Sequence, residues 1–566
     1  MEDNVPRGTL FFTFQKIEKT KMNIKEYIIS GNIIDIIKKE IYPGSLTISN
    51  GKIKNINKTN TNSGNYILPG FIDSHVHIES SMLVPSEFAK IAVRHGTVAT
   101  VSDPHEIANI MGVKGVEFMI SNGNTVPFKF NFGAPSCVPA TEFETSGEKI
   151  GSKEIKTLLV KKEIVCLAEV MNYRGVINAD NELHKKINLS KKFNKKIDGH
   201  APGLFGKDLE KYIKAGITTD HESINIKEAV EKINNGMKIQ IREGSAAKNF
   251  NELHELIDRF PEMIMLCTDD IHPEDLQKSH INDLVIRGRK YGLNIYNLLR
   301  AASFNPIKHY NLDVGLLQIN DPADFIVVED LESFKVLATY INGIKVYENG
   351  KVLFSGGTIK RINKFNREPV DNKSVEIESK ASKINVIEAN EGQLFTKRKI
   401  CEAKINNNKL ICDIEKDLLK IIVISRYNNQ EPAVGFIKGF KLKKGAIASS
   451  IAHDSHNIVA VGTNDNDLVT AVNKIIELKG GLVAVHNKTI QYLSLEIAGI
   501  MSDQNVFSVA KTYNNLNKTV QEFGSTLKSP YMTLSFMALL VIPELKIGDK
   551  GLFDVNKFQF ISLFNE

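Results

Sequence analysis

Hydrophobic and polar positions alternate in blocks through the middle of the chain, and this alternation predicts a barrel. Between about residues 68 and 312, short apolar runs end in polar residues and are separated by amphipathic helical stretches. There are eight such runs: LPGFIDSHVH, TVATVSDPHE, FNFGAPSC, IVCLAEVMN, KKIDGHAPG, ITTDHES, KIQIREGS and IMLCTDD. Eight strand–helix units in about 245 residues are what a (β/α)8 TIM barrel requires.

Strand-like segments flank the predicted barrel on both sides. Before it come IISGNIIDII, SLTISNGKIKNI and NYILPG, which are separated by turn signals. After it, DPADFIVVED and TYINGIKVYENGKVLF have the same character. We therefore expect residues 23–67 and 313–360 to pair into one small composite β-sandwich, with the barrel over 68–312 between them.

The two ends of the chain differ from this middle part. Residues 1–22 begin acidic, and their apolar patch is too short for a signal peptide, so we expect a disordered N-terminal extension. Residues 361–393 are polar with weak periodicity and predict a linker. Over 394–566, strand-like runs (IIVISRY and both arms of GAIASSIAHDSHNIVAVG) accompany the amphipathic segment DLVTAVNKIIEL and predict an additional α+β domain.

Composition narrows the class of protein without defining its function. Hydrophobic residues make up 42% and charged residues 24%, as in an ordinary folded protein. The net charge of +6 comes from lysines spread among acidic residues, so neither nucleic acid nor a membrane surface is indicated as a partner. Five cysteines without a C-x-x-C pair predict neither a disulfide framework nor a thiolate zinc site, and they fit the reducing cytoplasm.

Side chains that bind metals stand at the ends of the predicted strands, the end of a barrel where active sites lie. His75 and His77 are one residue apart, so on a strand both point to the same side and reach one metal ion. Glu169 ends the fourth run, and a carboxylate there can bridge two cations.

Three further side chains complete this pattern. His200 and His221 end the fifth and sixth runs and suit a second metal position, while Asp269 ends the eighth. A carboxylate at Asp269 can bind metal and also accept a proton from a metal-bound water. Together these residues predict a binuclear metal centre; a polar pocket without metal is the alternative.

The order His-x-His, Glu, His, His, Asp resembles the amidohydrolase superfamily, and within it the adenine deaminases. The motifs PGFIDSHVHIESSM, SDPHEIANIMG, LAEVMNYRGVI, DGHAPGL, IREGSAAKN and LCTDD carry the resemblance, with AHDSHNIVAVG, GGLVAV and IAGIMS downstream. It covers about residues 25–566. Two departures stand out: Glu169 takes the place of the carbamylated lysine of many amidohydrolases, and Glu496 stands where a proline is expected.

The resemblance implies hydrolysis of adenine to hypoxanthine and ammonia, a step of purine salvage. A hydroxide held between two divalent cations would attack C6 of adenine. Asp269 would take the proton from that water and deliver it to the leaving ammonia, and Glu169 would bridge the cations. The resemblance favours Mn²⁺, with Fe²⁺ or Zn²⁺ as alternatives. It also implies a cytoplasmic homo-oligomer.

Two motifs offer groups that could read the edge of the purine. The first, SDPHE, has the alternative of capping a loop or supporting the metal ligands, and the second, REGSA, that of a structural Arg–Glu ion pair. Their candidate residues are Asp103, His105, Glu106, Arg242, Glu243 and Ser245. In the C-terminal part, His453, Asp454 and His456 predict a contribution to the active site, as a further metal site or a lid, or else a tight turn.

Rival functions remain at this point. A dihydropyrimidinase- or dihydroorotase-like cyclic amidase, or a deaminase of a different nucleobase, would use a similar centre. A deaminase of the cytidine type is disfavoured because its H-x-E and P-C-x-x-C ligands are absent. A non-catalytic scaffold with an amidohydrolase-like barrel would be expected to lose metal ligands, and all six are present.

Overall fold

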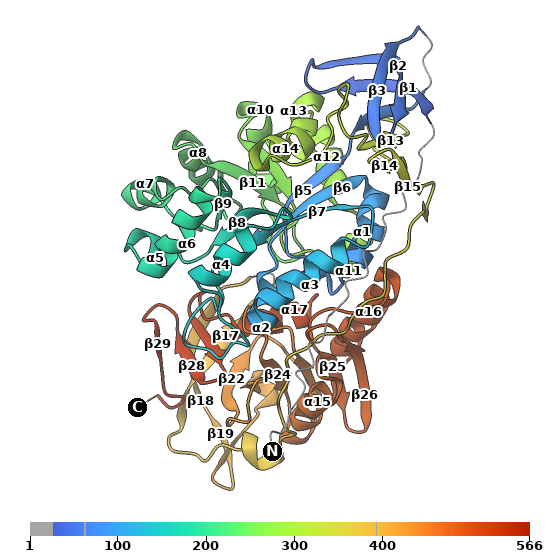
Figure 1. Cartoon of the computed structure of the whole chain (residues 1–566). Coiled ribbons are helices and arrows are strands. Elements are labelled where there is room, and N and C mark those ends of the chain that lie inside the picture. Colours follow the sequence, from blue (N-terminus) through green and yellow to red (C-terminus); the bar gives the residue numbers. More distant parts are fainter. Residues whose placement is uncertain (1–25, 61–63, 392, 566) are drawn as a thin grey trace, which may run out of the picture.

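A computed structural model describes residues 26–60, 64–391 and 393–565, so the predicted extension over residues 1–22 lies outside the described part. Its central feature is a parallel barrel (Figure 1). The eight strands coincide with the eight predicted runs: β5 (Phe71–Val76), β6 (Thr97–Ser102), β7 (Lys129–Ala134), β8 (Ile164–Val170), β9 (Lys196–Gly199), β10 (Thr219–Asp220), β11 (Lys238–Arg242) and β12 (Ile264–Cys267).

The strands form two parallel sheets that close into a ring. Strands β5 to β9 make one sheet in sequence order, and β10 to β12 make the other. The first junction is a hydrogen bond of 2.9 Å from the Thr218 amide to the Ile197 carbonyl. The second is a parallel bridge between Val76 and Asp269. The predicted TIM-barrel fold is therefore confirmed.

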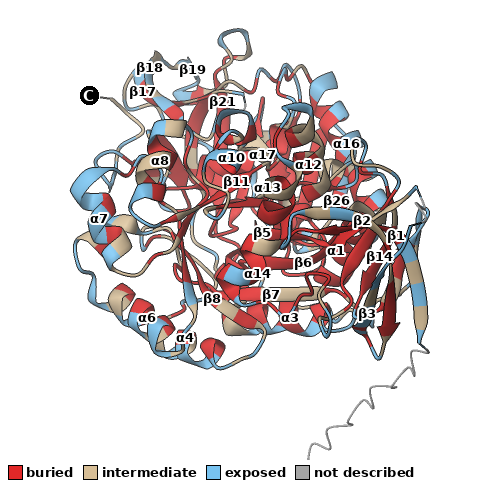
Figure 2. Ribbon diagram, turned by 90° about the horizontal axis from the view of Figure 1, so that it is seen from above, coloured by how far each residue is buried: buried red, intermediate tan, exposed pale blue. Residues whose placement is uncertain are grey.

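Helices surround the barrel because each has one apolar face to bury, and Figure 2 shows the buried strands at the centre with exposed helix faces outside. In α6, Asp180 caps the first turn by accepting the Leu183 amide at 2.8 Å, and Leu183 and Ile187 are buried. The main surrounding helices are α1 (Pro85–Ala92), α2 (His105–Met111), α3 (Val113–Gly123), α4 (Ser152–Leu159), α6 (Asn181–Lys192), α7 (Gly206–Lys214), α8 (Ile226–Asn234) and α12 (Ile281–Lys290).

The two flanking segments pair with each other, as the pattern predicts. They form one eight-stranded sheet in the order β16-β15-β14-β13-β4-β1-β2-β3, in which β4 pairs antiparallel with β13. The sheet curls over a shared apolar core: Lys52 bridges to Pro322, and the Tyr27 hydroxyl donates to the Gly343 carbonyl at 2.5 Å. The strands are β1 (Tyr27–Asp35), β2 (Glu40–Ser49), β3 (Lys52–Lys58), β4 (Tyr66–Pro69), β13 (Phe325–Val328), β14 (Val336–Ile341), β15 (Ile344–Glu348) and β16 (Lys351–Val352).

The C-terminal part is built on a second eight-stranded sheet, in the order β18-β17-β22-β21-β24-β23-β25-β26. The predicted amphipathic helix is α15 (Asp465–Leu478), and it packs on β23, β24 and β25. The strands are β17 (Lys383–Ala389), β18 (Thr396–Glu402), β21 (Leu419–Ile424), β22 (Ala433–Lys438), β23 (Ala446–Ser449), β24 (Ile458–Gly462), β25 (Gly481–His486) and β26 (Thr489–Ser494). This confirms an α+β domain.

One predicted boundary is wrong. The expected linker over residues 361–393 contains β17, which lies between β18 and β22 and belongs to the C-terminal sheet. Its sequence, KINVIEA, shows no alternation because consecutive residues from Ile384 to Ile387 are buried on both faces of the sheet. The C-terminal sheet therefore begins before the predicted boundary at residue 394.

The C-terminal domain packs against the barrel and shares its core. The Ser502 amide donates to the Met82 carbonyl at 2.8 Å, and one apolar cluster includes both Leu83 and Met501. Helix α16 (Val506–Glu522) packs on α11 (Pro273–Leu276), which follows the last barrel strand. No helix among the described residues is both long and apolar enough to cross a membrane.

Candidate active site

The first predicted ligand pair lies where β5 meets the segment after β12. His75 is within β5, His77 follows it, and their ring centroids are 4.9 Å apart. The Asp269 amide donates to the His75 carbonyl at 2.9 Å, and the His77 amide donates to the Asp269 carbonyl at 3.1 Å. Asp269 has a φ of 56°, a left-handed conformation that aspartate tolerates better than most residues. This backbone geometry places the Asp269 carboxylate beside both imidazoles.

Glu169, at the end of β8, occupies the middle of the cluster. Its Oε1 lies 3.3 Å from His77 Nε2, while its Oε2 lies 3.4 Å from His221 Nε2 and 2.9 Å from His200 Nδ1. Asp269 Oδ1 lies 3.2 Å from His77 Nε2 and 3.5 Å from His75 Nε2. All six side chains predicted as ligands therefore converge on one buried site. That they bind metal remains a prediction of this geometry.

The donor set fits divalent cations. Most of these distances exceed an ordinary hydrogen bond, whereas two ligands at ~2.1 Å from a tetrahedral ion lie about 3.4 Å apart. His75 Nε2 is buried and has no hydrogen bond within the described part of the chain. His77 donates its Nδ1 hydrogen to the Asp103 carbonyl at 3.0 Å, so its Nε2 carries the lone pair that faces the carboxylates.

The close packing of imidazoles and carboxylates also shifts the pKa values of the cluster. Burial raises the pKa of Glu169, but His200, His221 and His77 outweigh burial and hold that pKa well below its usual range. Burial lowers the pKa of His221, yet Glu169 and Asp269 raise it to about 9. The site thus favours positive charge at its centre, and protons compete with any metal ion for the same nitrogen atoms.

The HES motif supplies a further member of the site, Glu222, which the sequence reasoning did not single out. Its carboxylate receives two hydrogen bonds from Arg242, Nη1 to Oε1 at 2.6 Å and Nη2 to Oε2 at 2.9 Å. Arg242 Nη1 also donates to Asp269 Oδ2 at 2.6 Å. The alternative of an Arg242–Glu243 ion pair is therefore wrong: Arg242 pairs with Glu222 and Asp269, and Glu243 pairs with Lys248 and Arg287. A carboxylate directly after a predicted ligand, His221, was the available signal.

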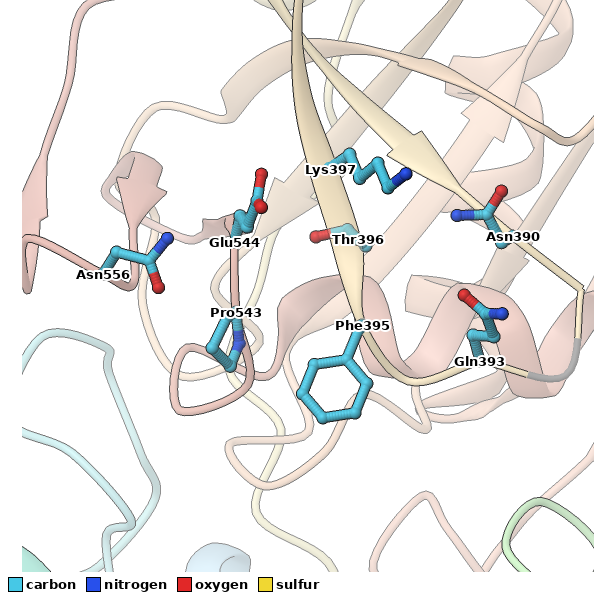
Figure 3. A pocket seen from close by; sticks show the side chains of 8 residues that line it. All are labelled: Asn390, Gln393, Phe395, Thr396, Lys397, Pro543, Glu544 and Asn556. Carbon is cyan, nitrogen blue, oxygen red and sulfur yellow. The ribbon is translucent and has the colours of Figure 1, made fainter. Parts of the chain in front are cut away.

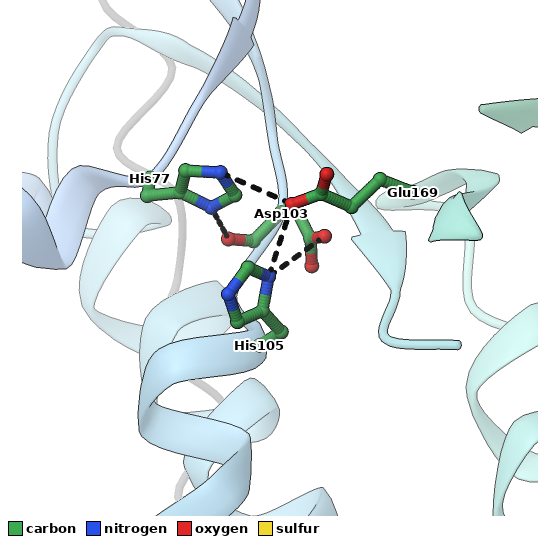
Figure 4. Close-up of side chains that lie close together, drawn as sticks. All are labelled: His77, Asp103, His105 and Glu169. Carbon is green, nitrogen blue, oxygen red and sulfur yellow. Dashed lines mark hydrogen bonds and ion pairs between the residues drawn. The ribbon is translucent and has the colours of Figure 1, made fainter. Parts of the chain in front are cut away.

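The SDPHE motif lies against the cluster of predicted metal ligands, next to His77 and Glu169 (Figure 4). His105 Nδ1 is 3.0 Å from Asp103 Oδ2 and 3.5 Å from Glu169 Oε1, and both His105 and Asp103 are buried. The next residue, Glu106, turns toward the C-terminal domain. It pairs with His453 and, at 2.5 Å, with His456 Nε2. The expected contribution of HDSHN thus reaches the mouth of the barrel.

The structure does not bring the remaining two candidates to this cluster. Glu243 pairs with Arg287 at 2.8 Å and with Lys248 at 3.4 Å. The Ser245 hydroxyl donates to Asp275 Oδ2 at 2.8 Å and accepts the His272 amide at 2.9 Å. These contacts hold both side chains within the loop after β11, apart from the six predicted ligands.

A separate surface pocket lies in the C-terminal domain (Figure 3). It has a volume of about 230 Å³, and its lining contains no histidine or cysteine. The eight lining residues are Asn390, Gln393, Phe395, Thr396, Lys397, Pro543, Glu544 and Asn556. Without a cluster of metal donors, this pocket does not compete with the barrel mouth as the active site.

Comparison with known proteins agrees with this architecture. Residues 66–352, more than half of the chain, match the profile described as "Amidohydrolase family", which is the class that the barrel and its strand-end ligands define. Residues 393–559 match the "Adenine deaminase C-terminal domain".

Full-length relatives narrow the class. A protein named adenine deaminase from Methanosarcina acetivorans is 50% identical over 96% of this chain and 100% of its own length. Proteins of the same name from Methanosarcina barkeri and a Sulfurovum species are 51% and 52% identical over 94% of this chain and 98% and 99% of their own lengths. The chain belongs to the adenine deaminase family.

Proposed function

We propose that this chain hydrolyses adenine to hypoxanthine and ammonia with two divalent cations at the mouth of its barrel. The carrying observation is the convergence of His75, His77, His200, His221 and Asp269 around Glu169, at the ends of five barrel strands. Names of relatives at about 50% identity over nearly the whole chain support adenine as the substrate.

Glu169 would contribute one oxygen to each of two cation positions. Its Oε1 faces His77, and its Oε2 faces His200 and His221, so each oxygen serves a different group of histidines. When bound, two cations supply a water of lowered pKa as the nucleophile. A mixed set of imidazoles and carboxylates suits Mn²⁺, Fe²⁺ or Zn²⁺ better than Mg²⁺, and we propose Mn²⁺.

Asp269 is the proposed proton carrier. Its Oδ1 faces His75 and His77, where it can accept a proton from the attacking water and return it to the departing ammonia. Its Oδ2 is held by Arg242, which itself is anchored by Glu222. Arg242 therefore orients the carboxylate, and we propose a positioning role for it.

The proposed substrate contacts lie beside Glu169, on the segment after β6. Three candidate residues follow β6 at the same end of the barrel and are buried next to the predicted metal ligands: Asp103, His105 and Glu106. Glu106 is further covered by His453 and His456. Polar groups held this rigidly can discriminate between purine edges, because a wrong base leaves them unpaired.

Two finer points belong to the same proposal. The five cysteines are free, and three of them are buried, which fits a reducing compartment such as the cytoplasm. Assembly into a homo-oligomer, with a small molecule as the only substrate, stays a prediction.

The test loads the purified full chain with Mn²⁺ and follows ammonia and hypoxanthine after addition of adenine. Stoichiometric formation of both products is expected. Ring opening of hydantoin or dihydroorotate without ammonia release from adenine would replace the deaminase by a cyclic amidase. Ammonia release from another nucleobase but not from adenine would change the substrate assignment, and the proposed metal chemistry would still stand. Fewer than about one ion per chain after loading would support the scaffold alternative.

A further inference from the structure

A second buried cluster lies where the barrel meets the C-terminal domain. From the barrel come His105 and Glu106, the first residues of α2, and from the loop between β23 and β24 come His453 and Asp454. These four side chains are 4%, 2%, 7% and 4% exposed. The proposed pair of cations uses none of them as a ligand, and a cation bound by His105 and Glu106 would take the place of the direct substrate contacts proposed above for these two side chains.

The orientation of His105 indicates which of its nitrogens is available. Nδ1 donates to Asp103 Oδ2 at 3.0 Å, which leaves the lone pair on Nε2. A carboxylate that accepts one ring N–H and thereby fixes the other nitrogen as a donor is the usual arrangement behind a metal-bound histidine. His105 Nε2 points away from Glu169 and toward Glu106 and Asp454.

The distances around Nε2 are those of shared ligands. Nε2 lies 3.5 Å from Glu106 Oε1 and 3.9 Å from Asp454 Oδ1, both too long for a hydrogen bond. Ligand atoms around one tetrahedral ion at ~2.1 Å are about 3.4 Å apart, which is comparable to both distances from Nε2. The three atoms lie within 4.8 Å of one another.

The carboxylates at this junction are compensated by histidines and not by lysine or arginine: His453, His456 and His105 hold the pKa of Glu106 well below its usual range. Within the described residues, no lysine or arginine forms an ion pair with Glu106 or Asp454; their charged partners are histidines alone. Asp454 Oδ2 is buried without a hydrogen bond. Buried carboxylates are costly unless a cation or several hydrogen bonds compensate them.

We propose that a third divalent cation binds at this junction, held by His105 Nε2, Glu106 Oε1 and Asp454 Oδ1. It joins the barrel to the C-terminal domain and is distinct from the pair around Glu169. Imidazole with two carboxylates is a donor set for Mn²⁺, Zn²⁺ or Fe²⁺. The neighbouring trio of Glu106, Asp270 and His453 has similar spacing, which makes Glu106 the centre of the junction.

The test is the metal content of the full chain after loading with Mn²⁺ and dialysis. About three ions per chain are expected for the native sequence and about two for Asp454→Asn, which keeps the size of the side chain and removes its charge. Glu144→Gln is the matched control, since Glu144 is also a buried carboxylate beside the HDSHN loop but lies outside the trio, and it should retain about three.

Two bound ions per chain in both the native protein and Asp454→Asn would overturn the proposal of a third site, without affecting the proposed deaminase function. Fewer than two in Asp454→Asn would instead count against the pair around Glu169. Should Asp454→Asn fail to fold, anomalous diffraction at the manganese edge from native crystals decides the question. A peak about 2.0–2.3 Å from His105 Nε2 is expected, and its absence would refute the site.

Discussion

The carboxylate of Asp269 has two oxygens in different environments. Oδ1 lies among imidazoles, and Oδ2 is tied to Arg242 at 2.6 Å. Burial raises the pKa of Asp269, but Arg242, His75 and His77 outweigh burial and hold it well below its usual range. Asp269 is therefore ionised before the reaction begins, as a proton acceptor must be.

Asp269→Asn tests this role most directly. The amide keeps the shape of the side chain but cannot accept a proton, so kcat should fall by about 10²–10⁴-fold, the usual contribution of a general acid–base group. Steady-state ammonia release measures it. Asp208→Asn, an exposed position on α7, is the control and should keep native activity. Full activity in Asp269→Asn would remove Asp269 from proton transfer.

Arg242→Gln separates positioning from substrate recognition. Loss of the guanidinium charge raises the pKa of Asp269, because Arg242 is the strongest of the groups that lower it. Activity requires ionised Asp269 and is lost as the pH falls through its pKa, so the acidic limb of kcat/KM should move to higher pH. Profiles of kcat/KM against pH measure this shift.

The exposed Arg259→Gln is the control for that profile and should leave the limb in place. A raised KM for adenine with an unmoved acidic limb would instead show that Arg242 contacts the substrate.

How far single residues can be predicted depends on where their partners lie in the chain. Glu169 and the histidines were found because each ends an apolar run, a local signal. The pairing of Glu106 with His453 was not predictable, since these residues are 347 positions apart and only the packed domains bring them together. Glu222 was missed because its partner, Arg242, lies on the neighbouring strand.

At the scale of elements, one buried lysine fixes the loops that carry two of the proposed ligands. Lys232 of α8 is fully buried, and its Nζ contacts Asp220 Oδ2 at 2.9 Å, Glu228 Oε1 at 2.8 Å and the Ala201 carbonyl at 2.7 Å. Asp220 directly precedes His221, and Ala201 directly follows His200. This lysine therefore connects the ends of β9 and β10.

Lys232→Met should destabilise the protein strongly. It leaves the Asp220 and Glu228 carboxylates buried without a cation, which costs about 3–5 kcal/mol when one member of a buried pair is removed. Urea unfolding measures the loss in the free energy of unfolding. Lys227→Met, at an exposed position of the same helix, should change that free energy by less than about 0.5 kcal/mol. Equal stability of the two variants would show that the network contributes little.

The eight barrel strands were predictable as elements because each is a short apolar run with a polar end. Strand β17 was not, since a short strand buried on both faces lacks the alternation that marks a half-buried one. Pairing of the two flanks into one small β-sandwich was expected from their shared character, whereas the single continuous sheet that they form, curled over its own core, required the structure.

At the scale of the whole molecule, the sequence suggests separable units, but the packing joins them. The amidohydrolase match ends at residue 352, which suggests that the barrel could fold as an independent domain. One continuous apolar cluster nevertheless runs from barrel residues such as Leu83 and Phe88 to Met501 and Val509 of the C-terminal domain. The aromatic ring of Tyr513 in α16 also packs against the imidazole of His272 beside α11, with the ring centroids 5.5 Å apart.

A chain ending at residue 357 should therefore fail to form a stable monomer. Removal of residues 358–566 exposes the apolar residues of the barrel that face the C-terminal domain, and large exposed apolar patches drive association. The truncation also removes His453 and His456, the two histidines that form ion pairs with Glu106. Size-exclusion chromatography should show aggregates, and co-expression of residues 358–566 as a separate chain should restore a soluble complex because it covers the same surface. A monomeric truncated chain that unfolds cooperatively and binds Mn²⁺ like the full protein would show that the barrel is independent and that the C-terminal domain serves another purpose.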